Sequence, residues 1–274
     1  MRYILLLLVL LFLTKESVAS VVEEKYLDGG MYYVGAVFGE HDYKAQANVQ
    51  IQPFYMMTTE VSYALWQSVY HWAASHGYQF DDGCNGSVDE DCRPSGARDD
   101  QHPVTHVEWL DSVIFANALS EKLKLQPVYR LSNGAPLRDK AQTAQFHVDP
   151  AANGYRLPTL NEWHIAARGG KAALVAGTYG NPHSGSATAA PQREVYGTHR
   201  VKSGQANASG LYGMDRNVSE WVYDSELMAN IRMYYYCGGS YSFLTGSLAS
   251  CDFHSAGFTG PDIGFRLVRS DVGA

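Results

Sequence analysis

Charged residues are scarce in this sequence, and basic clusters are missing. Only 18% of the 274 residues are Asp, Glu, Lys or Arg, the formal net charge is -7, and no run of Lys or Arg occurs. Nucleic acids and anionic membrane surfaces are bound by clustered basic side chains. We therefore expect neither a nucleic-acid partner nor an anionic membrane surface.

A long hydrophobic run is also missing. The apolar stretch from Ile4 to Leu13 has ten residues, whereas a membrane-spanning helix needs roughly 20. A basic N-terminus, this short stretch and a polar segment with small residues up to Ala19 give the three-part layout of a secretory signal. We predict a cleaved signal peptide at residues 1–19 and an exported mature chain, residues 20–274, without a membrane span.

Cysteine is infrequent, and its spacing excludes a thioredoxin-like site or a zinc ribbon. The four cysteines are Cys84, Cys92, Cys237 and Cys251, and no two form a Cys-x-x-Cys motif. An even number in an exported chain predicts two structural disulfides. Three pairings are open, and the short spans favour Cys84 with Cys92 and Cys237 with Cys251. The alternative is a redox-active pair at Cys237 and Cys251.

Helical periodicity is confined to short stretches. These stretches are residues 60–76, 108–124 and 159–168. The third opens on Thr159-Leu160-Asn161-Glu162, the spacing of a capping box, and Gly169-Gly170 should end it. No long periodic element is predicted between residues 171 and 210, and no linker, low-complexity boundary or internal repeat divides the chain. We predict one domain over residues 20–274, of α+β class with much irregular backbone.

Several motifs follow one another in the order found in one protein family. The most specific is the segment from Gly154 to Trp163, Gly-Tyr-Arg-Leu-Pro-Thr-Leu-Asn-Glu-Trp, which continues to Arg168-Gly169-Gly170. The others are His102-Pro103-Val104, Gly210-Leu211-Tyr212-Gly213-Met214, Asn217-Val218-Ser219-Glu220-Trp221, Gly238-Gly239-Ser240-Tyr241 and Gly264-Phe265-Arg266-Leu267. Together they resemble the formylglycine-generating-enzyme (sulfatase-modifying factor) family over roughly residues 26 to 269. The resemblance implies an α+β, formylglycine-generating-enzyme-like variant of the C-type lectin fold, rich in irregular structure.

The catalytic positions of that family do not hold cysteine in this sequence. In its copper-dependent oxidases, two cysteines that follow the Gly-Gly-Ser motif bind the metal as thiolates. The corresponding positions are Phe243 and Leu248, which offer neither sulfur nor a lone pair. The resemblance therefore implies no copper and no catalytic residue. A rescue by Cys237 or Cys251 would need a shifted loop and would break the expected disulfide.

Calcium is the cofactor that the resemblance implies. The family's structural Ca²⁺ ligands map to the backbone carbonyls of Arg216 and Val218 and to the carboxylate of Glu220. The preceding side-chain ligand maps to Gly213, which offers none. Since Ca²⁺ takes 6 to 8 oxygen ligands, Asp215 would have to compensate from nearby.

An acidic loop surrounds the first two cysteines. Its acidic residues are Asp81, Asp82, Asp89, Glu90 and Asp91. Such a loop suits a basic protein partner or Ca²⁺, although a run of this kind is more often a solvated loop that a disulfide holds in place. We expect a partner-binding surface here.

Export, a single domain and the missing catalytic cysteines together resemble the family's periplasmic, non-catalytic regulators of the TagR type. These act in type VI secretion by engaging the periplasmic part of a transmembrane threonine kinase. We therefore expect a periplasmic binding protein whose partner is such a kinase domain. The alternative is a periplasmic oxidase of the type that matures the siderophore pyoverdine, with its chemistry at residues such as Glu220, Tyr241 or His254 that no motif assigns.

Overall fold

The computed structural model describes residues 22–34, 47–86, 92, 99–179, 197–242 and 250–272. Its elements are β1 (Glu24–Leu27), β2 (Gly30–Val34), β3 (Ala47–Ile51), β4 (Phe54–Met57), α1 (Tyr63–Ala74), α2 (Trp109–Lys122), β5 (Tyr129–Leu131), the 3-10 helix η2 (Lys140–Gln145), β6 (Phe146–Val148), β7 (Tyr155–Arg156), α3 (Leu160–Ala167), α4 (Gly170–Ala176), β8 (Ser219–Met228), β9 (Ile231–Cys237), β10 (Cys251–Ser255), β11 (Ile263–Gly264) and β12 (Val268–Ser270). The predicted signal peptide lies outside the described residues. Short helices and strands joined by irregular segments confirm the α+β class.

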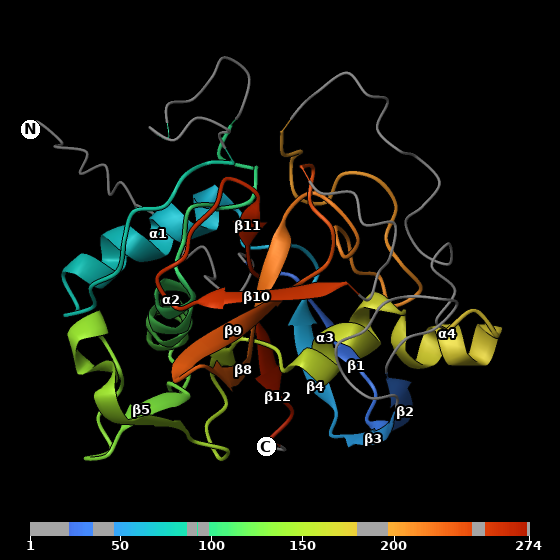
Figure 1. Cartoon of the computed structure of the whole chain (residues 1–274), viewed down its shortest axis with the longest axis horizontal. Helices are drawn as coiled ribbons and strands as arrows, with labels where there is room; N and C mark the ends of the chain where they lie inside the picture. The colour runs from blue at the N-terminus through green and yellow to red at the C-terminus, as the bar shows by residue number, and fades with distance from the viewer. Residues whose placement is uncertain are drawn as a thin grey trace, which may run out of the picture.

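Two four-stranded and two two-stranded sheets form the β structure of the described residues. One four-stranded sheet has the order β1-β4-β12-β7 and the other β10-β9-β8-β11, while β2-β3 and β5-β6 are the two-stranded sheets. The first sheet joins both ends of the described chain, because β1 and β12 both pair antiparallel with β4. In Figure 1 the second sheet crosses the middle of the molecule, with α1 and α2 on one side and α3 and α4 on the other.

Helices α1 and α2 confirm the helical stretches predicted at residues 60–76 and 108–124, with shorter ends. Helix α1 begins later than predicted because Ser62 is its N-cap: the Ser62 hydroxyl accepts a backbone N–H of the first turn. The two helices pack through aromatic side chains, and the indole of Trp66 stacks on Phe115 at 4.7 Å between ring centroids. No helix of the described residues is long and apolar enough to cross a membrane.

Helix α3 confirms the predicted capping box. The Thr159 hydroxyl accepts the backbone N–H of Glu162 at 3.2 Å, and the Glu162 carboxylate accepts that of Thr159 at 2.8 Å. Arg156, at the end of β7, donates two hydrogen bonds of 2.7 Å to the same carboxylate. This ion pair fixes the start of α3 against the first sheet.

The glycine pair ends α3 as predicted, but a further short helix starts directly after it. Gly169 has a left-handed backbone, with φ 83°, and α3 ends before it at its C-cap Arg168. Gly170 then begins the short helix α4, which runs to Ala176 and ends at a second left-handed glycine, Gly177. A left-handed glycine changes the direction of the chain, but it does not prevent a new helix from starting directly after it.

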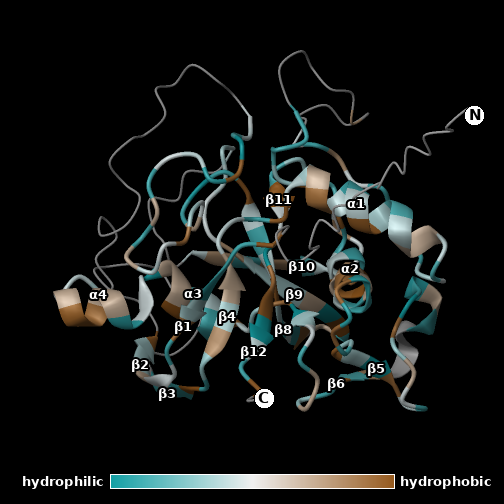
Figure 2. Ribbon diagram, turned by 180° about the vertical axis from the view of Figure 1, so that it is seen from behind, coloured by the Kyte–Doolittle hydropathy of each residue, from teal (hydrophilic) through white to brown (hydrophobic). Residues whose placement is uncertain are grey.

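The core consists mainly of two hydrophobic clusters. One surrounds α1 and α2, and the other lies between α3, β4 and β9. Hydrophobic residues are visible along α2 and the central strands in Figure 2. The largest fully buried apolar side chains are Trp66, Trp109, Trp163 and Trp221.

Candidate functional site

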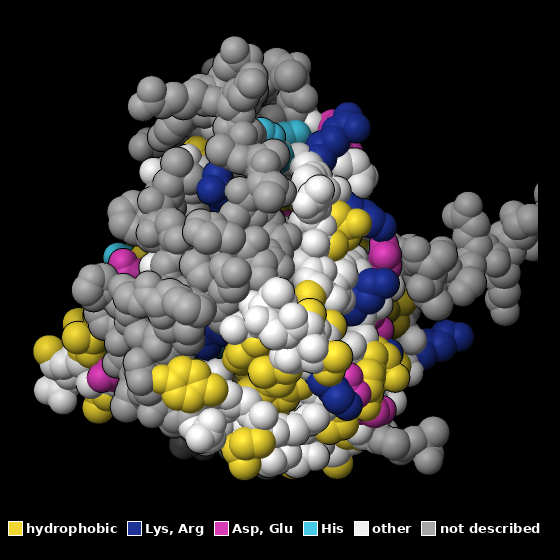
Figure 3. All heavy atoms as spheres, turned by 90° about the vertical axis from the view of Figure 1, so that its right-hand side faces the viewer, with side chains coloured by type: hydrophobic (Ala, Val, Ile, Leu, Met, Phe, Trp, Pro, Cys, Tyr) yellow, Lys and Arg dark blue, Asp and Glu magenta, His cyan; other side chains and the backbone are white. Residues whose placement is uncertain are grey.

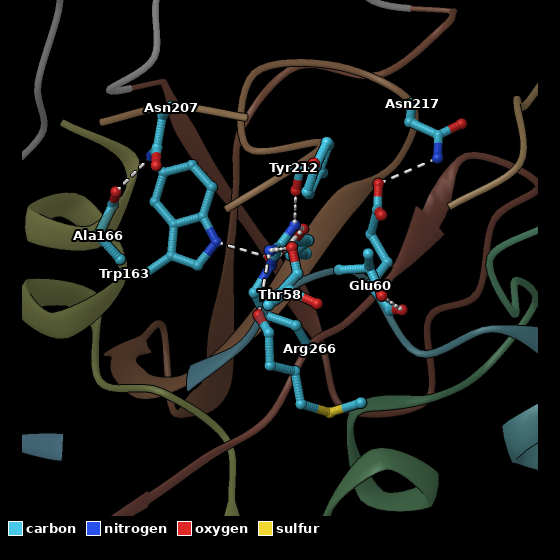
Figure 4. Close-up of polar contacts among 11 residues, drawn as sticks. Thr58, Glu60, Trp163, Ala166, Asn207, Tyr212, Asn217 and Arg266 are labelled. Carbon is cyan, nitrogen blue, oxygen red and sulfur yellow. Dashed lines mark hydrogen bonds and ion pairs between the residues drawn. The ribbon is translucent and has the colours of Figure 1, made fainter. Parts of the chain in front are cut away.

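A buried polar cluster lies where β8, β11 and α3 meet (Figure 4). We call it the Arg266 cluster, and it comprises Glu60, Trp163, Asn217, Glu220 and Arg266. Arg266 and Glu220 are both fully buried and form a bidentate ion pair with N–O distances of 2.7 to 2.9 Å. The indole N–H of Trp163 donates to the same carboxylate at 2.8 Å. Glu220 is therefore an internal counter-ion of Arg266.

Backbone carbonyls complete the surroundings of the Arg266 guanidinium. It donates to the carbonyl of Tyr212 at 2.6 Å and, over longer distances of 3.3 and 3.4 Å, to the carbonyls of Thr58 and Met57. A buried charge is tolerated when it is paired and hydrogen-bonded in this way. These contacts come from three separate segments. Through them, Arg266 of the C-terminal motif is hydrogen-bonded to the end of β4.

Glu60 is the second carboxylate of the Arg266 cluster, and it is less well satisfied. Its Oε1 accepts the amide of Asn217 at 3.0 Å, while its Oε2 has no hydrogen-bond partner among the described residues. Burial raises the pKa of Glu60 to about 7; Arg266 lowers it and the neighbouring Glu220 raises it further. At neutral pH this carboxyl therefore exists in both protonation states.

Gly213 makes room for the Glu60 carboxylate. A Cβ atom at residue 213 would lie 2.2 Å from Oε1 of Glu60, and the residue has a left-handed φ of 67°. Glu60 thus fills the space into which a side chain at residue 213 would project. This is the position at which the family resemblance implies a side-chain ligand for calcium.

Both disulfides favoured by the sequence are present. Cys84 pairs with Cys92 and Cys237 with Cys251, and no cysteine is free. Cys237 ends β9 and Cys251 begins β10, directly opposite one another in the antiparallel pair. The second disulfide therefore lies inside the central sheet, whereas the first holds a loop.

A histidine accompanies the second disulfide. The imidazole Nε2 of His164, in the middle of α3, lies 3.5 Å from Sγ of Cys251, and all three donor atoms of His164, Cys237 and Cys251 lie within 4.8 Å of one another. Trp163 precedes His164 in α3 and points into the Arg266 cluster. Helix α3 therefore reaches both the polar cluster and the disulfide.

The Gly-Gly-Ser motif is held by an aspartate. Ser240, fully buried, donates to Oδ2 of Asp262 at 2.7 Å, and Ser242 donates to the same atom. The positions of the family's copper ligands, Phe243 and Leu248, follow directly and lie outside the described residues. Tyr241 donates its backbone N–H to the carbonyl of Asn217 at 3.1 Å.

The acidic loop is only partly described. Asp81 forms an ion pair with Lys140 at 2.9 Å, and Lys140 also contacts Glu108 and Asp111 at 2.8 Å. Asp82 is exposed. The other three acids, Asp89, Glu90 and Asp91, lie outside the described residues, so the predicted partner surface stays a prediction.

The comparison with protein families covers nearly the whole chain. The family described as "Sulfatase-modifying factor enzyme 1-like domain" (FGE-sulfatase) matches residues 13–271. This chain belongs to that family. The structure thereby confirms the fold expected from the sequence motifs, an FGE-like α+β fold.

Relatives of different kinds share this FGE-sulfatase fold. A crystal structure of CarF is 47% identical, covers 91% of this chain and 98% of its own, and has a TM-score of 0.81. The chaperone protein LppX of Paenibacillus barcinonensis is 28% identical over 251 residues, which cover 81% of this chain and 82% of LppX. The structure of PvdO from Pseudomonas aeruginosa covers 90% of this chain and 94% of its own at a TM-score of 0.63, with 17% identity. This last likeness concerns the fold alone.

The residues of this FGE-sulfatase domain do not fit the copper site of the family's oxidases. That site needs two thiolates, but the corresponding positions are Phe243 and Leu248, and all four cysteines of the chain are in disulfides. Phe and Leu offer no donor atom to a soft metal ion. No step of the copper-dependent reaction can therefore be assigned to these residues.

The predicted calcium ligands of the domain lie beside the Arg266 cluster. The carboxylate of Glu220 already accepts hydrogen bonds from Arg266 and Trp163, so a calcium ion would have to share it with both. Asp215, the expected substitute, lies 3.8 Å from the guanidinium of Arg216. A calcium ion at Arg216, Val218 and Glu220 stays a prediction.

Sequence reasoning missed two features of this region. The proximity of His164 to the disulfide had no local signal, because the contact joins residues that are 87 positions apart. The buried state of Glu60 was also missed, although Gly213 offered an indirect signal. A glycine at a position where the family resemblance implies a side chain leaves space that another residue must fill.

Proposed function

We propose that this chain is an exported, non-catalytic member of the FGE-sulfatase family that acts by binding another protein. The observation that carries the proposal is the state of its cysteines, which are all paired in disulfides. A thiolate is needed both as a ligand for copper and as a nucleophile toward substrate. Together with Phe243 and Leu248 at the catalytic positions, this leaves the family's oxidase reaction without its reacting group.

Two observations support a protein as the binding partner. The relative LppX is named a chaperone, a class of protein that acts on other proteins. In addition, large apolar side chains are exposed, among them Met31 of β2 and Val175 of α4, which are 61% and 82% exposed. Hydrophobic side chains gather on the lower part of the face seen in Figure 3, where β2, β3 and α4 lie in Figure 1. Such patches are common at interaction sites.

For the partner itself we propose the periplasmic domain of a membrane threonine kinase of a type VI secretion pathway. The proposal follows from the resemblance to non-catalytic periplasmic regulators and from the predicted signal peptide, which would place residues 20–274 in the periplasm. The acidic loop with Asp81, Asp82, Asp89, Glu90 and Asp91 would supply charge complementarity toward a basic surface.

Calorimetric titration of the mature chain with the purified kinase domain tests this proposal. We expect saturable binding that the triple variant D89N/E90Q/D91N weakens by about tenfold at low salt, because salt screens the attraction between oppositely charged protein surfaces. The matched control is Asp252→Asn, an exposed acid on β10, which should bind as the wild type does. If the kinase domain does not bind, the proposed partner is wrong. If the mature chain also fails to suppress the aggregation of an unfolded protein, as a chaperone would, the proposal that it acts by binding proteins is contradicted.

The second candidate is a periplasmic oxidase of the siderophore-maturation type, and the likeness in fold to PvdO supports it. Tyr241 and His254 are the residues on which it would depend, and His254 stacks on Phe258 at 3.6 Å between ring centroids. Oxygen consumption with a small aromatic substrate, abolished in His254→Gln, would establish this candidate. Such turnover would at the same time contradict the non-catalytic proposal.

From the family resemblance we also propose a structural calcium ion at Arg216, Val218 and Glu220. A ligand that binds only the folded state raises its stability, by about 3 kcal/mol at a hundredfold excess over the dissociation constant. We therefore expect the melting temperature to rise when Ca²⁺ is added to EDTA-treated protein, and Mg²⁺ serves as the control. An identical melting temperature in EDTA and in millimolar Ca²⁺ would exclude the site.

A further inference from the structure

Three metal-ligating side chains meet in the second hydrophobic cluster. His164, Cys237 and Cys251 are 2%, 0% and 9% exposed, and we call them the His164 cluster. Their donor atoms all lie within 4.8 Å of one another, and Nε2 of His164 lies 3.5 Å from Sγ of Cys251. These donor atoms are not part of the Arg266 cluster. The Cys237–Cys251 disulfide joins the two sulfur atoms, and the imidazole of His164 lies beside it.

The distance between His164 and Cys251 suits a metal ion held by two sulfurs and one nitrogen, and the two sulfurs, bonded at 2.03 Å, would move apart on reduction. Zinc–sulfur and zinc–nitrogen bonds are about 2.3 and 2.0 Å long, which in a tetrahedral site separates sulfur and nitrogen by about 3.5 Å. The imidazole nitrogen and Sγ of Cys251 are already at this separation. Two thiolates and an imidazole are also the donors that thiophilic ions such as Zn²⁺ prefer.

Rigid elements hold all three ligands in place. Cys237 and Cys251 are opposite residues of β9 and β10, so their side chains project from the same face of the sheet. His164 belongs to α3, whose start is fixed by its capping box and whose neighbouring Trp163 is bound to Glu220. Ligands on packed helices and strands keep their positions better than ligands on loops.

From this geometry we propose that reduction of the Cys237–Cys251 disulfide converts the His164 cluster into a binding site for one Zn²⁺ ion. Reduction breaks the S–S bond and adds two electrons and two protons; a dithiol reductant of the thiol–disulfide oxidoreductase class supplies them and becomes a disulfide itself. Zn²⁺ then displaces both thiol protons, which pass to solvent, and two Zn–S bonds and one Zn–N bond form.

Charge balance allows the ion to be buried. Two thiolates without a metal would be uncompensated inside an apolar cluster, so the reduced cysteines stay protonated until Zn²⁺ binds. A Zn²⁺ ion with two thiolates and a neutral imidazole has no net charge, so the reduced site is stable in the core when the metal is present. The link between β9 and β10 would therefore have two states, in one of which a disulfide joins Cys237 and Cys251 and in the other a metal ion does. This property does not depend on the proposed protein partner.

A second group of the same composition is less suitable. Cys84, Cys92 and His106 also place their donor atoms within 4.8 Å, but Cys92 and His106 are only partly buried. His106 is not part of a helix or strand, and Cys92 has neighbours on both sides that lie outside the described residues. The double variant C84S/C92S removes this group and leaves the His164 cluster as the remaining thiol site.

Metal titration of the reduced C84S/C92S chain tests the proposal. After anaerobic treatment with a phosphine reductant, we expect one equivalent of Zn²⁺ to bind, and Co²⁺, added as an optical probe, to give thiolate charge-transfer absorption. His164→Gln should weaken Zn²⁺ binding by at least about tenfold. The matched control is His254→Gln on β10, which should leave the affinity unchanged. Equal affinity in the two histidine variants would overturn the proposal, as would the absence of binding.

A redox titration covers the case in which the reduced chain without metal unfolds. Oxidised C84S/C92S is equilibrated in glutathione buffers with and without Zn²⁺, and the fraction of reduced Cys237 and Cys251 is measured by thiol trapping. Because Zn²⁺ would bind only the reduced state, a hundredfold excess over its dissociation constant should raise the equilibrium constant for reduction by about a hundredfold. The same increase in His164→Gln, or no increase at all, would contradict the site.

Discussion

Glu60 is the residue in which burial and charge oppose each other most directly. Burial raises its pKa to about 7; Arg266 and the amide of Asn217 lower it, and Glu220 raises it. Its Oε2 finds no hydrogen-bond donor among the described residues. The folded chain therefore holds the proton of Glu60 more tightly than the unfolded chain does, and the carboxyl is still partly protonated at neutral pH, which is unusual for glutamate.

We predict that Glu60 makes the folded state less stable as the pH rises. Its pKa is raised from an ordinary value of 4.5, so the folded chain binds the proton more tightly than the unfolded chain between about pH 4.5 and 7. Over that interval its contribution to stability is lost, by about 3 kcal/mol at most. Urea denaturation at pH 5 and pH 8 should show that Glu60→Gln gains stability over the wild type as the pH rises.

Glu162 gives the opposite sign and serves as the control. Burial would raise its pKa, but the ion pair with Arg156 and the hydrogen bonds of Thr159 outweigh burial and lower it. Its contribution to stability is therefore present at neutral pH and is lost as the pH falls through the lowered pKa. Glu162→Gln should cost more stability at pH 8 than at acid pH. Parallel pH profiles of the two variants would contradict the roles assigned to both residues.

At the residue scale, contacts within one motif are easier to predict than contacts between motifs. Arg156 and Glu162 form an ion pair within one motif, whereas Arg266 and Glu220, which are 46 positions apart, pair across two motifs. The bond between Glu60 and Asn217 joins residues 157 positions apart. Its formation depends on how β4 and β8 are placed in space, which no local pattern specifies.

At the scale of elements, the capping box of α3 offers a direct test. We predict that Thr159→Ala destabilises the chain by about 1 kcal/mol, because it removes the hydroxyl that accepts a backbone N–H of the first turn. The change also loosens the helix that carries Trp163 and His164. Thermal unfolding followed by circular dichroism measures the loss.

The control for the capping box is Ser75→Ala, at the C-terminal end of α1. Its hydroxyl is exposed and donates to the carbonyl of Trp72, so the change should cost no more than about 0.5 kcal/mol. If both variants lose the same stability, the capping box contributes no more to α3 than an exposed surface hydrogen bond does.

Element prediction succeeded where the local signal was complete, as at both ends of α3, but it did not include the short helix that follows. The hydroxyl and carboxyl of the capping box gave the start of α3 correctly, since both partners lie within four residues. Gly169-Gly170 was interpreted as the end of the helix, which α3 confirms, but the helix that begins at Gly170 was not predicted. A left-handed glycine is compatible with either a loop or a new helix after it, and in this chain α4 follows and buries its residue Ala173.

At the scale of the whole molecule, the motifs predicted the fold because they are spread over the entire chain. Gly264 illustrates why: a Cβ atom there would lie 2.6 Å from the carbonyl oxygen of Val104, so β11 can approach this distant segment only as glycine. The site was harder to predict, since its distinctive groups, Glu60 and the His164 cluster, are assembled from segments far apart in the chain. Long-range contacts of this kind follow from the fold and not from local spacing.

The two disulfides should differ in their effect on the stability of the whole molecule. Cys237–Cys251 joins adjacent strands of the central sheet inside a hydrophobic cluster and closes a span of 14 residues. Loop-closure entropy gives about 3 kcal/mol for such a span, and two buried hydroxyls in C237S/C251S add a further cost. Cys84–Cys92 closes a span of 8 residues, and Cys92 is only partly buried.

We therefore predict a loss of at least about 3 kcal/mol for C237S/C251S and a smaller loss, near 2 kcal/mol, for C84S/C92S. Urea denaturation of both oxidised double variants measures the difference, and a larger loss in C84S/C92S would place the stabilising link in the loop instead of the central sheet.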